Sequence, residues 1–207
     1  ALKGGGYVVI SSNNTPAAWL TRYSSIEDKT GTTVQLNYYG SGSSGIDVTA
    51  LEDGGYLVSW TGTSQTLYTQ RYDASHATVG TPVSLTTGGQ SARISEVLAM
   101  PDGGYIVAWE KTITSGTGTN LYVQRFNNAN ESVTTPVEIN ASATQSQYNS
   151  VLANTSDGGY VLAWVSEVNS SDILVQKFGA DNTAGAIQTV AMSGTSRDLR
   201  PALVGLK

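Results

Sequence analysis

Short apolar runs separated by polar turns recur along this chain, and one of these runs occurs four times. β-Branched and aromatic residues follow a Gly-Gly pair in YVVIS, YLVSW, YIVAW and YVLAW. The copies begin at Tyr7, Tyr56, Tyr105 and Tyr160, so they are 49, 49 and 55 residues apart. No helical period of 3.6 residues continues beyond one turn. The spacing predicts four repeated β units in place of one irregular domain.

Each repeat contains four short apolar segments divided by turn-forming residues. The first ends just before Asp-Gly-Gly, which favours a tight turn because glycine accepts a positive φ and Asp hydrogen-bonds nearby backbone. The Gly-Gly-Tyr segment comes next, followed by a segment of the type Gln-Arg-Tyr. The fourth segment contains Pro82 or Pro136 in the middle repeats, which suits an edge strand because no amide donor is needed there. The pattern predicts four antiparallel strands per repeat.

The faces of these strands indicate how the units pack. Both faces carry apolar residues, so each sheet should be covered on both sides. Four-stranded units of about 50 residues are typical of the blades of a β-propeller. We predict an all-β fold, a four-bladed β-propeller, in which residues 1–207 form a single domain. Its repeats lie at about 1–50, 51–99, 100–153 and 154–207.

The two chain ends indicate how such a ring could close. The C-terminal run RPALVGLK, from Arg200 to Lys207, matches the first strand of the other repeats, whereas the N-terminus begins at the GGGY strand. We expect the N- and C-terminal strands to pair, so that one blade is built from both termini and no sheet edge stays open. The alternative is a segment cut from a longer array, in which both ends are cut edges.

Composition narrows the classes of function and partner. The net charge is −5 and there is no block of Lys and Arg, which argues against nucleic acid. The absence of cysteine excludes disulfides and thiolate chemistry. No apolar run is long enough to span a membrane. Charged residues make up only 13% of a chain rich in Ser, Thr, Gly and Asn, and this favours a secreted, extracellular or cell-surface location.

The string A-L-x-D-G-G-Y-x-V-x-W followed by x-Q-R-Y-D resembles a repeat of very large secreted bacterial proteins, including adhesins and calcium-binding proteins of the RTX type. Ala50–Trp60 with Thr69–Asp73 is the best copy, and Ala99–Trp109 with Val123–Phe126 is next. The resemblance covers all four repeats and implies propeller repeats and secretion. The glycine-aspartate nonapeptides that bind calcium in RTX proteins are absent, as is the calcium loop of integrin-type propellers. No cofactor or metal is predicted, and calcium stays open without a motif for it.

Two acids and one cation are candidates for a site on the propeller axis. Asp47 and Glu96 hold matched positions in the first strands of adjacent repeats, and Arg200 lies two residues before the matched position of the last repeat. Together the two acids could hold a cation or a polar ligand. The alternative is that they are solvated at the mouth of a channel.

Two further candidates lie where the repeats differ. Trp19 replaces a residue that is Tyr or Leu in the other copies, which is typical either of a ligand platform or of drift in packing. The loop from Glu110 to Asn120 contains the six extra residues of the third unit, and insertions on one rim of a repeat fold commonly carry recognition. Glu110 is therefore a ligand-binding candidate, and the equivalent loop of the fourth unit carries Glu167.

Residues shared by all copies are predicted to serve the fold. The turn aspartates Asp53, Asp102 and Asp157 lie about a blade apart, too far to share an ion. The repeated cation, an Arg in three units and Lys177 in the fourth, should find a carbonyl or carboxylate partner, because an unpaired buried charge is costly. His76, the one histidine, is expected to be solvated in its loop. With a single histidine, the chain cannot form a zinc site that needs several histidines.

We therefore predict a non-catalytic binding or adhesion module of a secreted or cell-surface bacterial protein, with a glycan or another surface ligand as its partner. The first alternative is a structural or self-associating unit of a larger extracellular assembly or tandem array. The second is a small propeller glycoside hydrolase or lyase. No spacing singles out a catalytic pair of carboxylates, so the prediction is that the protein is not an enzyme.

Overall fold

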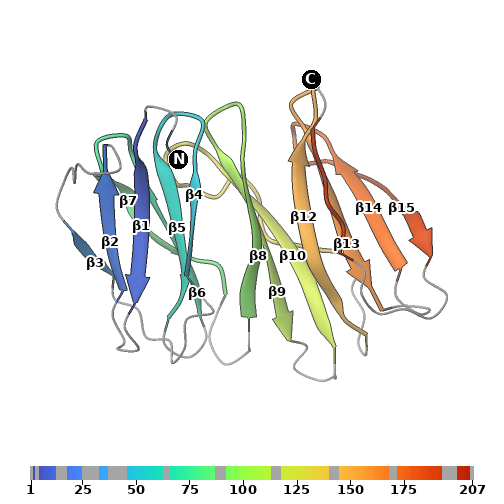
Figure 1. The fold of residues 1–207 in the computed structure, drawn as a ribbon. Helices are drawn as coiled ribbons and strands as arrows, with labels where there is room; N and C mark the ends of the chain where they lie inside the picture. Colours follow the sequence, from blue (N-terminus) through green and yellow to red (C-terminus); the bar gives the residue numbers. More distant parts are fainter. Residues whose placement is uncertain are drawn as a thin grey trace.

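The computed structural model describes residues 2, 5–12, 18–24, 33–36, 46–62, 66–86, 92–112, 118–139, 145–167, 172–192 and 200–205. All regular structure in these ranges is β-strand. The strands form four antiparallel sheets, here called A to D, that stand side by side in chain order (Figure 1). The all-β prediction is confirmed.

Within each sheet the strands follow the order of the chain, as the repeat pattern predicts. Sheet A contains β1 (Tyr7–Ser12), β2 (Ala18–Tyr23) and β3 (Val34–Leu36). Sheet B contains β4 (Ile46–Ala50), β5 (Tyr56–Thr61), β6 (Leu67–Tyr72) and β7 (Thr78–Ser84). Sheet C contains β8 (Ala92–Ala99), β9 (Tyr105–Thr112), β10 (Thr119–Phe126) and β11 (Val137–Ile139). Sheet D contains β12 (Gln147–Asn154), β13 (Tyr160–Ser166), β14 (Asp172–Phe178) and β15 (Ala184–Met192).

The prolines of the fourth segments lie at sheet edges, as expected. Pro82 is within β7 and Pro136 directly precedes β11, and each of these strands pairs with only one neighbour in its sheet. A proline there removes no hydrogen bond from the ladder. The edge position explains why proline is tolerated in an otherwise β-forming run.

Three apolar layers hold the four sheets together, one between each successive pair. Between A and B the layer is built around Leu20 and Tyr56, between B and C around Leu57 and Trp109, and between C and D around Leu121 and Trp164. The burial of large aromatic rings in each layer is the main favourable contribution to packing. The two-sided apolar pattern of the strands thus arises because inner sheets contact a neighbour on each face.

Each glycine of the Gly-Gly pair has a separate geometric role. Gly54, Gly103 and Gly158 have φ values of 86°, 83° and 83°, a region that other residues rarely adopt. The second glycine has no room for a side chain. A Cβ at Gly55 would collide with the backbone oxygen of Tyr72 on the neighbouring strand. The same collision occurs at the matched glycines Gly6, Gly104 and Gly159.

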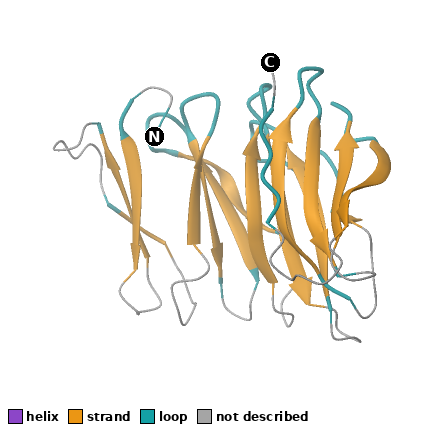
Figure 2. Ribbon diagram, turned by 45° about the vertical axis from the view of Figure 1, so that its right-hand side comes forward, coloured by secondary structure: helices purple, strands orange, loops and turns teal. Residues whose placement is uncertain are grey.

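The predicted pairing of the N- and C-terminal strands is wrong for this structure. Residues 200–205 form no strand, and Gly205 lies against the backbone of Asn154 at the end of β12. Sheet A, with its three described strands, lies at the opposite end of the row from sheet D (Figures 1 and 2). The arrangement of sheets is propeller-like, but it is open. Residues 206 and 207, also part of that prediction, lie outside the described residues.

Candidate functional site

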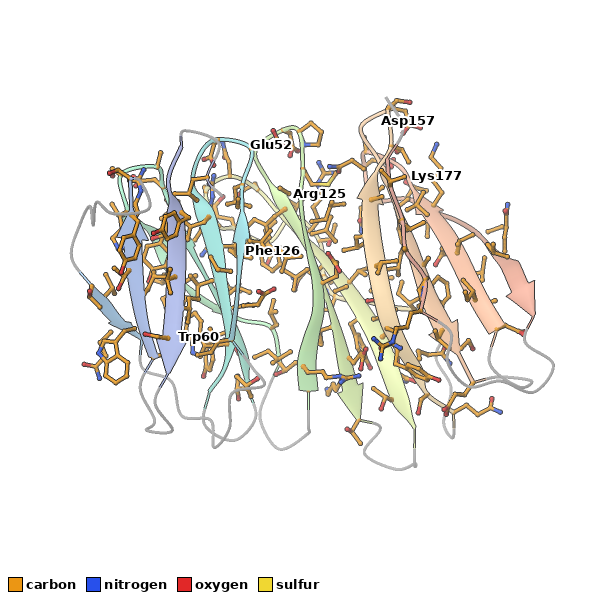
Figure 3. The ribbon with its side chains drawn as sticks, in the orientation of Figure 1. Glu52, Trp60, Arg125, Phe126, Asp157 and Lys177 are labelled. Atoms are coloured by element: carbon orange, nitrogen blue, oxygen red, sulfur yellow. The ribbon has the colours of Figure 1, made fainter. Side chains whose placement is uncertain are left out.

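The turn aspartate and the repeated cation form one ion pair in each of sheets B, C and D. In sheet C, Arg125 Nη2 lies 2.6 Å from Asp102 Oδ2, while Oδ1 of Asp102 accepts the N–H of Gly104 at 2.9 Å. Burial alone would raise the pKa of Asp102, but the Gly104 amide and Arg125 together hold it below the ordinary value. Each carboxylate thus supports its own turn and neutralises its own cation. The matching pairs are Arg71 with Asp53, and Lys177 with Asp157, the last two of which are labelled in Figure 3.

Two of the repeated cations, Arg22 and Arg125, also connect neighbouring sheets. Arg125 donates to the carbonyl oxygen of Ala180, in the loop of sheet D, and Arg22 of sheet A donates to that of Ala74 in sheet B. The prediction that these cations find carbonyl or carboxylate partners is confirmed. The turn aspartates act in the fold, as expected, and are occupied by partners within the chain.

The tyrosine of the Gly-Gly-Tyr strand is held by a stacked ring and by a loop residue. Tyr105 stacks on Phe126 with ring centroids 4.9 Å apart, and its hydroxyl donates to Asn130 Oδ1 at 2.6 Å. Asn130 has a φ of 67°, which asparagine tolerates better than most residues. Burial raises the pKa of Tyr105. The arrangement recurs in sheet D with Tyr160, Phe178 and Asn182.

His76 occupies in sheet B the position that asparagine holds in sheets C and D. Its φ is 74°, its Nδ1 hydrogen-bonds the hydroxyl of Tyr56, and its ring lies 5.8 Å from the rings of both Tyr56 and Tyr72. The prediction of a merely solvated histidine is therefore wrong. His76 replaces an asparagine in a structural contact, and sequence spacing alone did not show the match.

The repeated glutamine fixes the outer strand in sheets B, C and D. Gln124 Nε2 donates to the carbonyl oxygen of Thr134 at 2.7 Å, and Gln176 Nε2 donates to that of Gly185 at 2.8 Å. Gln70 Nε2 likewise donates to Val79 at 3.1 Å. All three side chains are buried. The glutamine side chain donates a hydrogen bond to a backbone carbonyl at the point where the fourth strand departs from regular pairing with the third. The repeated glutamine therefore has a structural role.

Trp19 is explained by its partner across the strands. In sheets B and C, Trp60 lies opposite Tyr68 and Trp109 lies opposite Tyr122, with stacked rings. In sheet A the residue opposite Trp19 is Ser11. The large aromatic ring has thus moved to the other strand of the pair. Trp19 remains half-buried on the face of sheet A that no other sheet covers among the described residues.

The structure brings the predicted axial acids Asp47 and Glu96 into electrostatic contact. They lie on β4 and β8, two first strands that contact each other. Burial, and then the negative charge of Asp47, raise the pKa of Glu96. Asp47 is exposed and accepts the N–H of Val48 at 2.8 Å. The two acids form a pair along the inner strands, and Glu96 retains a proton more readily than an ordinary glutamic acid does.

Glu110 is engaged within the fold. Its side chain is buried, Oε2 lies 2.7 Å from Arg93, and Oε1 accepts the N–H of Asn149 at 3.0 Å. Asn149 has a positive φ at an irregularity of β12, which turns its N–H toward the neighbouring sheet. Glu110 thus connects sheets C and D. Of the loop that follows it, residues 113–117 lie outside the described residues.

A cleft of about 820 Å³ lies at the Asp-Gly-Gly end of sheets B, C and D. Leu98 and Leu152 form part of its apolar wall, and the segment Leu203–Gly205 borders it. A smaller cleft of about 340 Å³ on the other side of that segment includes Asp157 and Lys177. Arg200 is exposed at the start of the same C-terminal segment. None of the five predicted ligand residues is among the residues that line either cleft.

Matched positions of three repeats converge on the larger cleft. The residue directly before Asp-Gly-Gly is Glu52 in sheet B, Pro101 in the turn of sheet C and Ser156 in sheet D, and all three line the cleft. Its remaining polar lining includes Asn154 and Thr155. The residue before Asp-Gly-Gly differs between the copies, whereas Asp-Gly-Gly itself is constant. A comparison of the copies at this position could therefore have pointed to the cleft from the sequence.

Metal and membrane sites receive no support from the described residues. In that part of the chain, no group of three or more His, Asp or Glu side chains is arranged to hold a metal ion. Nor does the same part contain a helix long and apolar enough to cross a membrane.

Neither a protein-family model nor a curated protein sequence matches the chain. Solved structures do resemble it in fold. A polysaccharide lyase, the PL25 ulvan lyase, superposes with a TM-score of 0.54 at 10% identity, over 89% of this chain and 56% of the lyase. The same lyase bound to -[GlcA(1-4)Rha3S]- gives a TM-score of 0.52. An endo-arabinase from Bacteroides thetaiotaomicron gives 0.49 at 12% identity, over 95% of this chain and 82% of the enzyme. This chain spans little more than half of the lyase, and at 10% identity the likeness concerns the fold alone.

Proposed function

We propose that this chain is a non-catalytic carbohydrate-binding module of a secreted or cell-surface bacterial protein, serving adhesion, and that the glycan binds in the cleft at the Asp-Gly-Gly end. The observation that carries the proposal is the convergence of the variable turn residues Glu52, Pro101 and Ser156 on one cleft. In repeat folds, residues that differ between copies on one face commonly form the binding surface.

The chemistry of the lining fits a sugar. Glu52 offers carboxylate oxygens that can accept hydrogen bonds from ring hydroxyls, and Ser156 offers a hydroxyl. Leu98 and Leu152 provide apolar surface for the C–H face of a sugar ring. Pockets for small ligands combine apolar walls with a few polar groups in this way. Among the described residues that line the cleft, Glu52 is the one carboxylate, so these residues supply no pair of acids for hydrolysis.

A glycan array, followed by calorimetric titration with any sugar that binds, tests this function. The variants Glu52→Gln and Ser156→Ala should weaken binding several-fold without changing the fold. Glu131→Gln is the matched control, since Glu131 is exposed in the loop after β10 and away from the cleft lining. If no sugar binds, or if the cleft variants bind as tightly as the control, the proposal is wrong.

One observation favours a second candidate, a glycoside hydrolase or lyase. Glu96 has a raised pKa and lies near a second acid, Asp47, a combination suited to general acid and general base roles. In this candidate Glu96 donates a proton to the leaving oxygen and Asp47 acts as base. A polysaccharide panel assayed for cleavage tests it. Turnover that is abolished by both Glu96→Gln and Asp47→Asn would establish an enzyme, and absence of turnover on all substrates would reject it.

A further inference from the structure

The three joints between sheets are built from the same two faces. The front face of a sheet, which contacts the preceding sheet, carries the stacked aromatic pair and the strand tryptophan. In sheet C these are Tyr105, Phe126 and Trp109, and they pack on Leu57 and Leu67 from the back face of sheet B. Sheets A and B, and sheets C and D, join in the same way. Front meets back at every joint.

Among the described residues, no sheet covers the front face of sheet A. Its Tyr7 and Tyr23 stack with ring centroids 4.9 Å apart and planes 7° apart, like the buried pairs of the other sheets. Both rings are half-buried, whereas Tyr56 in sheet B is fully buried. Val9, on the same face, is 41% exposed. The face carries the residues of a joint, and none of the four described sheets packs on it.

Sheet D has the complementary back face. Val161, Ile173 and Val175 hold the positions that in sheet C belong to Ile106, Leu121 and Val123, three residues that are fully buried against sheet D. The three residues of sheet D are only half-buried. Lys177, at the position of Arg125, is present on this face too, so the cation that joins C to D is repeated at the end of the row.

The C-terminal segment lies where the first strand of a following sheet would lie. Asn154, at the end of β12, donates from Nδ2 to the carbonyl oxygen of Ala99 on β8 at 2.9 Å. Gly205 holds the same repeat position as Ala99 and lies against the backbone of Asn154. Residues 203–205 also border the cleft that contains Val161 and Lys177 of sheet D. Sheet A lacks this first strand among the described residues: β1 pairs with β2 alone.

We propose that copies of this chain associate head to tail, with the front face of sheet A in one copy packed on the back face of sheet D in the next. In this arrangement β1 of the second copy lies beside residues 200–205 of the first, and the two copies together complete a four-stranded sheet. A second copy is the partner because sheets A and D of one chain lie at opposite ends of the row (Figures 1 and 2). The new joint repeats the three that the chain already contains.

Cross-linking tests the joint directly, because the chain contains no cysteine of its own. Val9→Cys and Val175→Cys are made as separate chains, mixed and treated with a short bismaleimide. A covalent dimer in the mixture, and much less in either variant alone, is the expected result. In the double variant, linkage within one chain would mean that the same chain closes into a ring, and this would overturn the proposal.

Light scattering after size exclusion gives a second, independent readout. The protein should form dimers and longer species whose fraction rises with concentration, and Val9→Arg should weaken association at least tenfold. Val133→Arg is the matched control, since Val133 is 54% exposed in the segment between β10 and β11 and belongs to neither end face. A monomer at every soluble concentration, or equal weakening by the control, would show that the end faces do not associate.

Discussion

Tyr105 and Asn130 tie the start of β9 to the loop after β10, and Asn130 extends the tie to sheet B. The tyrosine hydroxyl donates to Asn130 Oδ1, and Asn130 Nδ2 donates to the carbonyl oxygen of Thr81 at 2.8 Å. Asn130 does so in a left-handed backbone conformation and is 5% exposed. One small amide thus satisfies a buried phenol and joins two sheets.

Replacing Asn130 should therefore be costly. Asn130→Ala loses two hydrogen bonds, each contributing about 1 kcal/mol, and keeps a strained φ at a cost of about 1 kcal/mol more. Asn130→Gly loses the same bonds without the strain, so it should be about 1 kcal/mol more stable than the alanine variant. Urea unfolding measures both. Equal stability of the two variants would show that the backbone conformation contributes nothing.

His76→Asn should be tolerated, because asparagine occupies the matched position in sheets C and D. The amide oxygen can accept the hydrogen bond of the Tyr56 hydroxyl, and asparagine accepts the positive φ. The expected change in unfolding free energy lies within about 0.5 kcal/mol, as for most mild substitutions. His76→Leu, which cannot accept the bond, is the control. A large loss in His76→Asn would mean that the ring stacking is what holds this loop.

The ion pairs of sheets C and D should respond differently to mutation. The side chain of Arg125 is 10% exposed and bonds both Asp102 and the loop of sheet D. Arg125→Ala should therefore lower the free energy of unfolding by about 1–3 kcal/mol. The side chains of Lys177 and Asp157 are 55% and 56% exposed, so Lys177→Ala should change little. Thermal and urea unfolding of the two variants check this. Equal losses would contradict the role of Arg125 as a link between sheets.

Glu96 should make the protein less stable as the pH rises. Burial and the charge of Asp47 raise its pKa in the folded state, so the folded chain binds the proton more tightly than the unfolded chain. Stability is then lost as the pH rises from the unfolded pKa through the folded one. Glu96→Gln should match wild type in acid and melt at a higher temperature at neutral pH. Asp47→Asn should shift the melting temperature in the same direction, and an unchanged pH profile in both would show that the two acids do not interact.

Trp109 and Trp19 allow a comparison between a tryptophan packed between two sheets and one on the front face of sheet A. Trp109 is 1% exposed and stacks on Tyr122, so Trp109→Ala should lower the free energy of unfolding by about 3–5 kcal/mol. Trp19 is half-buried on the front face of sheet A, which no sheet of the described residues covers, and Trp19→Ala should lose much less unfolding free energy in dilute solution. Urea unfolding at low protein concentration makes the comparison. Similar losses would mean that Trp19 is already packed in the monomer.

Local features of the fold were predictable from the sequence because they depend on short-range chemistry. The Gly-Gly pair, the edge prolines and the need of a repeated cation for a partner follow from backbone geometry and electrostatics. That Asp102 pairs with Arg125 did not follow, because the contact requires the register in which Ile106 lies opposite Arg125. The sequence indicated separate structural roles for the turn aspartates and the repeated cations. The structure shows that they form ion pairs with each other in sheets B, C and D.

The candidate site was less predictable, because it depends on contacts between distant segments. Trp19 could not be interpreted without its cross-strand partner Ser11. Glu110 was expected on an open rim, yet an irregularity in β12 brings the N–H of Asn149 to its carboxylate. The repeat pattern matched residues 200–205 to a first strand, but their position beside β12 is a tertiary contact that the pattern does not specify. Only the axial pair of Asp47 and Glu96 came together as the repeat alignment suggested.

The links from Arg22 and Arg125 to the following sheet give the A–B and C–D joints a direction. Both side chains donate forward along the chain, and the front and back faces that meet at the three joints carry different residues. Such a contact is heterologous, so it cannot form a two-fold dimer and must either close a ring of copies or continue as a filament. A chain with a blocked front face but an intact back face could join a filament at one end and accept no further copy there. Small amounts of Val9→Arg mixed into wild-type protein would then act as a terminator and shorten every filament that it joins.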